Sequence, residues 1–171
     1  MQNESLEHKL CKSCGLCCDG SLFVFVNLTD KDKQFTEWHL LKSGKNCELI
    51  FKQPCCYFNS RACMIYDQIR PAACSTFVCN IIVDYRVGDI SFDQALIIIQ
   101  DTVKLATNIK SKIVKNVSEY GQPLITLFNN YMSSQKNNNQ AVMMEYGVLQ
   151  HRLLKYFGKN IKYNCLYEQV K

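Results

Sequence analysis

Four cysteines stand within eight consecutive residues near the start of the chain, in the sequence CKSCGLCC from Cys11 to Cys18. Two residues separate each cysteine from the next in the series Cys11, Cys14 and Cys17. This spacing lets one tight loop turn several sulfurs towards a common centre. Gly15 can supply the backbone freedom that such a loop needs. Adjacent Cys17 and Cys18 are expected to point in different directions, so they need not share one metal.

A second group of cysteines follows further along the chain, in the sequence PCCYFNSRACMIYDQIRPAACSTFVC. Its members are Cys55, Cys56, Cys63, Cys74 and Cys79. A lone cysteine is usually a small buried hydrophobic residue, but two dense groups of cysteines favour metal ligation over packing. The two groups are here called the first cluster (residues 11–18) and the second cluster (residues 55–79). A metal with ligands from both clusters would hold two loops together.

The surroundings of these thiols are predicted to be reducing. The N-terminal sequence MQNESLEHKL lacks the basic start and the apolar run of a secretory signal, so a cytoplasmic location is expected. Disulfides rarely persist there, and clustered cysteines are typical of metal binding or catalysis. The odd total of eleven cysteines also argues against complete internal pairing.

Composition and charge restrict the partners. The longest apolar runs are far shorter than the roughly 20 residues that span a bilayer, which predicts a soluble protein without a membrane partner. The net charge of +5 counts every thiol as neutral, and metal-bound thiolates would lower it, so a nucleic-acid partner is not favoured. A protein partner and the oligomeric state stay open.

The elements that must position the cysteines are predicted from residue type and periodicity. Residues 21–29, SLFVFVNLT, are rich in aromatic and β-branched residues and predict a strand. Residues 29–44 have the apolar spacing of a short amphipathic helix that ends at Gly44. Residues 80–90, NIIVDYRVGDI, suggest a second strand followed by a turn.

The second half of the chain has helical periodicity. The sequence SFDQ predicts a capping box in which Ser91 and Gln94 open a long helix that runs to Gly121. Its apolar stripe comprises Leu96, Ile99, Val103, Ala106, Ile113, Val117 and Tyr120, and is interrupted at Lys110. Two further helices are predicted, around residues 124–131 and over residues 142–158.

These elements predict one domain over residues 1–171, mainly α with a small β element. A cysteine-rich, metal-stabilised N-terminal half, with the metal-binding region at 11–79, is expected to pack on a C-terminal helical hairpin within a helical region at 91–158. Lys110 is expected on a solvated helix surface.

The cysteine pattern resembles the YkgJ-type cysteine-cluster proteins, the CxxCxxCC family described as zinc- or iron-chelating. The family pattern runs CxxCxxCC, then C-P-F-L, then C-x-I-Y-E-x-R-P-x-x-C-R, and this chain has CKSCGLCC, CYF and CMIYDQIRPAAC in the same order. The resemblance implies metal-ligand roles for Cys11, Cys14, Cys17, Cys18, Cys56, Cys63 and Cys74, with Cys79 as an addition. Cys47, Cys55 and Cys165 are left without an assigned role.

The chain departs from the family pattern at three positions. Tyr57 stands where the family often has proline, Asp67 replaces glutamate, and Ser75 replaces an arginine. The loss of that arginine puts in doubt any charge-neutralising role of this position. Arg70 is kept, and its spacing from Asp67 predicts an ion pair on one helical turn.

The type of metal is predicted from the ligand pattern. Three cysteines at this spacing resemble half of an iron–sulfur ligand run, whereas zinc usually takes one CxxC pair and a distant second pair. A simple ferredoxin is excluded because Ser21 stands where its next cysteine would be. An iron–sulfur cluster, preferably 4Fe–4S, is therefore favoured over zinc, and His8 is expected to be an exposed residue without a ligand role.

Three classes of function follow. The first is a redox, sensing or accessory module that holds a cysteine-ligated cluster. The second is a structural zinc protein that binds a partner through its helical half. The third is a metal- or cysteine-dependent enzyme, for which the sequence has no GxGxxG, P-loop or HExxH motif.

Overall fold

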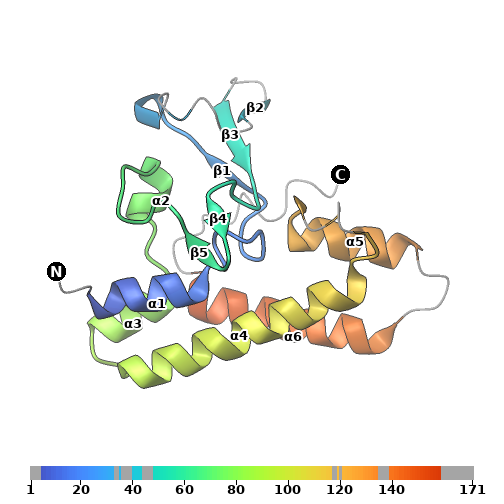
Figure 1. Ribbon diagram of the computed structural model, residues 1–171. Coiled ribbons are helices and arrows are strands. Elements are labelled where there is room, and N and C mark those ends of the chain that lie inside the picture. The colour runs from blue at the N-terminus through green and yellow to red at the C-terminus, as the bar shows by residue number, and fades with distance from the viewer. Residues whose placement is uncertain are drawn as a thin grey trace.

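The computed structural model describes residues 5–32, 35, 40–43, 48–116, 119, 121–134 and 139–158 (Figure 1). Its helices are α1 (Leu6–Cys14), α2 (Ala72–Thr76), α3 (Asn80–Arg86), α4 (Phe92–Ile113), α5 (Leu124–Ser134) and α6 (Gln140–Phe157), with a 3-10 helix η1 (Asp30–Asp32). Its strands are β1 (Phe25–Asn27), β2 (Leu40–Ser43), β3 (Glu48–Lys52), β4 (Phe58–Asn59) and β5 (Ala62–Cys63). The prediction of a mainly α fold with a small β element is confirmed.

One apolar core joins the cysteine-rich half to the helical half. Leu10 of α1, Ile81 of α3, Ile99 of α4, Leu124 of α5 and Leu149 of α6 are all buried in it. Figure 1 shows α1 and α3 beside the long helices α4 and α6, with α2 and the strands gathered on one side of this helical layer. The predicted packing of a cysteine-rich half on C-terminal helices is therefore confirmed.

Helix α4 begins where the capping box predicts. The Ser91 hydroxyl accepts a hydrogen bond from the Gln94 amide at 3.2 Å, and the Gln94 side chain accepts one from the Ser91 amide at 2.8 Å. The expected run to Gly121 is wrong, because the helix ends at Ile113 and Val114 is extended. Beyond it the chain turns back, and the Leu124 amide at the start of α5 donates to the Gly20 carbonyl at 2.8 Å. Val117 and Tyr120 lie outside the described residues.

Ser91→Ala is expected to lower the free energy of unfolding by about 1 kcal/mol, because the amide of Gln94 loses its acceptor at the start of α4. Urea denaturation of the purified protein measures the change. Ser111→Ala, at an exposed position of the same helix, is the matched control. An equal loss in both variants would contradict a specific contribution of the cap.

Helices α5 and α6 agree with their predicted positions. α6 starts at Gln140, after the N-cap Asn139, and ends at Phe157, with Gly158 as its C-cap. Phe128 of α5 stacks on Tyr146 of α6 with ring centroids 3.8 Å apart, so the two helices form a hairpin. Among the described helices, none is both long and apolar enough to cross a bilayer.

Two predictions for the N-terminal half are wrong. Residues 80–86, expected as a strand, form α3, in which Ile81 and Ile82 are buried in the core; tertiary packing overrides the strand preference of these β-branched residues. The predicted helix over 29–44 is replaced by η1 and by strand β2. The predicted stop of that helix, Gly44, lies outside the described residues.

The strands form two small antiparallel sheets. In the first, β3 lies between β1 and β2, and Val26 of β1 pairs with Phe51 of β3. In the second, β4 pairs with β5 so that Phe58 faces Cys63. The turn between β4 and β5 holds Arg61 in the left-handed region, with a φ of 62°. Strand β5 contacts α1, which brings Cys63 of the second cluster close to this helix.

Candidate metal centre

The first cluster begins on a helix and ends in a turn. Cys11 and Cys14 lie on the last turn of α1, three residues apart and therefore on one face. Gly15 ends the helix with a φ of 66°, and a Cβ at this position would meet the Phe58 ring at 2.5 Å. The amide of Cys18 then donates to the Gly15 carbonyl at 2.9 Å. Glycine is thus required both by the backbone and by the close approach of β4.

Hydrogen bonds from backbone and side-chain groups position the second cluster beside the first. The Cys55 amide, just after β3, donates to the Cys18 carbonyl at 2.8 Å. Arg61, in the turn between β4 and β5, donates to the Cys14 carbonyl at 2.8 Å. Asp32 is buried, and its carboxylate accepts from the Ala72 amide at 2.8 Å, which fixes the start of α2. Segments far apart in the sequence are thereby held around one space.

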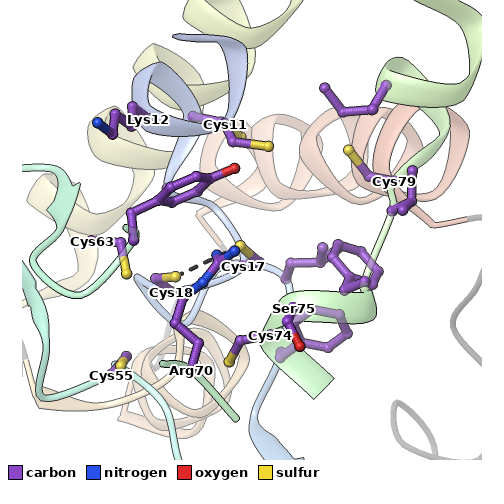
Figure 2. A pocket seen from close by; sticks show the side chains of 18 of the residues that line it. Cys11, Lys12, Cys17, Cys18, Cys55, Cys63, Arg70, Cys74, Ser75 and Cys79 are labelled. Carbon is purple, nitrogen blue, oxygen red and sulfur yellow. Dashed lines mark hydrogen bonds between the residues drawn. The ribbon is translucent and has the colours of Figure 1, made fainter. Parts of the chain in front are cut away.

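A cavity of about 500 Å³ occupies this space (Figure 2). The cysteines that line it are Cys11, Cys14, Cys17, Cys18, Cys55, Cys63, Cys74 and Cys79. Every predicted ligand except Cys56 therefore faces the cavity. Cys56 is exposed, while its neighbour Cys55, left unassigned from the sequence, is 8% exposed and lines the wall. Cys47 and Cys165 lie outside the described residues.

The sulfurs are spread around the cavity. Sγ of Cys17 and Sγ of Cys18 are 3.7 Å apart, so these neighbours point to the same place, contrary to the expectation from their adjacency. Within the described ranges, no three side chains of cysteine, histidine, aspartate or glutamate converge closely enough to hold a single ion. The described cysteines form no disulfide.

Burial keeps most of these thiols protonated when no metal is bound. It raises the pKa of Cys55 and of Cys74 to about 12 and that of Cys79 to about 11. Cys18 is the exception, since a hydrogen bond from the Cys17 thiol lowers its pKa, and the same bond raises the pKa of Cys17. Metal binding must therefore release several protons.

The side chain of Arg70 places a positive charge in the cavity. Its guanidinium carbon lies 4.2 Å from the centroid of the Tyr66 ring, and Figure 2 shows the side chain reaching among Cys17, Cys18 and Cys74. The predicted ion pair with Asp67 is wrong, because residues 64–67 form a turn in place of a helix. Asp67 lies instead beside Lys12 of α1, with a distance of 3.2 Å between Nζ and Oδ2.

His8 and Tyr66 complete this side of the cavity. His8 belongs to α1, and its ring meets the Tyr66 ring edge-on with centroids 4.2 Å apart. The side chain of His8 is 33% exposed and lines the cavity, so the prediction of an exposed terminal residue is wrong. The sequence offered no signal for this contact, because the partner lies far along the chain.

A buried ion pair lies directly after the first cluster. Lys110 Nζ of α4 donates to the Asp19 carbonyl at 2.7 Å and lies 3.2 Å from Asp19 Oδ2. The other carboxylate oxygen accepts from the Ser21 amide at 2.8 Å, and Arg61 approaches Asp19 at 3.8 Å. The side chains of Asp19 and Lys110 are only 10% and 15% exposed, so Lys110 is not on a solvated face. Its interruption of the apolar stripe was the available signal.

Comparison with known proteins gives one family. Neither the curated proteins nor the solved structures contain a match to this chain. A family model described as "CxxCxxCC: Putative zinc- or iron-chelating domain" matches residues 10–103, which is more than half of the chain and includes both cysteine clusters. The chain therefore belongs to the CxxCxxCC family, whose domains are described as chelating zinc or iron.

Proposed function

We propose that the protein binds an iron–sulfur cluster, preferably 4Fe–4S, in the cysteine-lined cavity and acts as a redox, sensing or accessory module. The observation that carries this proposal is the convergence of eight thiols from separate segments on one cavity of about 500 Å³. The proposal places the protein in a reducing compartment such as the cytoplasm, where thiols stay available to metal.

The donor set fits such a cluster. Thiolates are soft ligands that select zinc, copper(I) and iron–sulfur clusters. A tetrahedral zinc ion with Zn–S bonds of about 2.3 Å needs sulfurs about 3.8 Å apart, whereas a cluster holds its ligands around a larger volume. The spread of the sulfurs around the cavity, and the CxxCxxC spacing of Cys11, Cys14 and Cys17, both support the cluster.

The rest of the cavity wall suits electron transfer. A bound cluster would supply reversible one-electron chemistry. Phe23 and Phe77 meet edge-on with centroids 5.2 Å apart and, with Ile81 and Ile82, give the wall an apolar part that excludes water. Arg70 adds positive charge beside the thiols. Both apolar surroundings and nearby charge tune the reduction potential of such centres.

A structural zinc site is the second candidate. The distance of 3.7 Å between the sulfurs of Cys17 and Cys18 is close to the separation of two sulfur ligands on one tetrahedral zinc ion. In that case the metal would hold the loops of the N-terminal half in place, and the helices would make contact with a partner.

Anaerobic purification with metal and sulfide analysis separates the two candidates. We expect brown protein with iron and acid-labile sulfide in equal amounts, and visible absorbance that bleaches on reduction with dithionite. Cys55→Ser should lower the iron content, whereas Cys56→Ser, its exposed neighbour, is the matched control and should retain it. Colourless wild-type protein with stoichiometric zinc and no sulfide would reject the iron–sulfur proposal.

A further inference from the structure

We propose that the eight thiols form two separate four-cysteine centres that meet at the Cys17–Cys18 pair. This inference rests on the metal-binding function proposed above and states how the cavity divides its ligands. The first set comprises Cys11, Cys14, Cys17 and Cys79, and the second set comprises Cys18, Cys55, Cys63 and Cys74. Each set would take one thiophilic centre, either an iron–sulfur cluster or a zinc ion.

The first set belongs to the helical core. Cys14 is buried in the core that α1 shares with α3, α4, α5 and α6, and the other three cysteines of the set pack against that same core. Arg86 of α3 binds Glu7 of α1 through two hydrogen bonds of 2.7 Å. This bidentate pair ties the helix that carries Cys11 to the helix whose N-cap is Cys79.

The second set belongs to a different, smaller core. Cys55 is buried there with Leu28 and Phe51, and Cys18 and Cys74 pack against this group. Cys63 joins it through the β4–β5 hairpin, in which it pairs with Phe58, another member of the small core. The two apolar cores thus separate seven of the eight thiols in the same way as the two proposed sets, and Cys63 is linked to the small core through Phe58.

Figure 2 shows how the two sets meet. Cys11 and Cys79 lie on one side of the Cys17–Cys18 pair, and Cys55, Cys63 and Cys74 lie on the other. The two sulfurs of the pair are 3.7 Å apart, so the two sets touch at this pair. Cys17 packs against the helical core and Cys18 against the small core, which is the reason for placing them in different sets.

The ligand spacing suits two centres. In the first set, the CxxCxxC run is completed by a distant cysteine, which is the ligand pattern of a 4Fe–4S cluster. In the second set, the four cysteines come from four separate segments, and Arg70 reaches the place where the two sets meet, beside Cys18 and Cys74 (Figure 2). A cation at this place offsets the negative charge that four thiolates give to a metal centre.

Two variants test the division on the full chain, purified without oxygen. Cys79→Ser removes a ligand of the first set, and Cys55→Ser removes one of the second set. Iron, zinc and acid-labile sulfide per chain, together with the native mass of the protein, are measured for both variants, for the wild type and for the control Cys56→Ser. Circular dichroism reports whether each variant is folded.

We expect the wild type to carry two centres, and each variant to lose one centre and keep the other, so that the two losses add up to the wild-type content. If the native mass and the metal content show that the wild type holds only one centre, the division is overturned, even if a variant fails to fold. Loss of the same centre in both variants would also overturn it. Two zinc ions without sulfide would support the division while rejecting the iron–sulfur proposal, and wild-type protein without metal would reject both.

Discussion

Cys14→Ser is expected to abolish one metal centre and to lower the free energy of unfolding by at least about 3 kcal/mol, or roughly 10 °C in Tm. Cys14 is the last residue of α1, it is buried in the helical core, and its carbonyl holds Arg61. The same side chain is thus both a proposed ligand and a core residue. Metal binding can supply on the order of 10 kcal/mol, which is comparable to the whole stability of a domain.

Thermal unfolding with parallel metal analysis checks this expectation. If lost metal is the main cause, stripping the wild type with a chelator should bring its Tm down to near that of the variant. Cys56→Ser, which lies at the surface outside the cavity, should change neither quantity. Full metal content with unchanged thermal stability in the Cys14 variant would refute the ligand role.

Lys110→Met is expected to lower the free energy of unfolding by about 3 kcal/mol, because it leaves the buried Asp19 carboxylate without its nearest cation. Arg61 remains, but it is further away and more exposed. Removing both charges together in Asp19→Asn/Lys110→Met should cost less than the sum of the two single changes, because no uncompensated charge is then buried.

Urea denaturation of the two single variants and the double variant measures this coupling. Lys104→Met, at an exposed position of the same helix, is the matched control and should change stability by no more than about 0.5 kcal/mol. Strictly additive losses from the Asp19 and Lys110 changes would show that the two charges do not stabilise the fold as a pair.

The helical half was predictable because its signals are local. The Ser91–Gln94 capping box and the apolar stripe of α6 are both contained within a few turns of one helix. In the cysteine half the signals are not local. The β-branched residues of α3 favour a strand by themselves, and only the core that receives Ile81 and Ile82 makes the segment helical.

The same distinction applies to the candidate site. The spacing of the cysteines indicated metal chemistry, which the family match supports. Spacing could not show which of Cys55 and Cys56 faces inwards, because that depends on the hydrogen bond between the Cys55 amide and the distant Cys18 carbonyl. Nor could it show that Arg70 turns away from Asp67 to lie on Tyr66 among the thiols.

The position of Lys110 has a consequence for how the protein can diverge. The family match ends at residue 103, yet the cation that compensates Asp19, the residue directly after the cysteine pair, comes from beyond that limit. The nearest cation to a carboxylate inside the matched segment therefore lies outside that segment. In a relative with a different continuation of this helix, a carboxylate at this position would keep only the more distant and more exposed cation that Arg61 provides, unless another cation replaces Lys110.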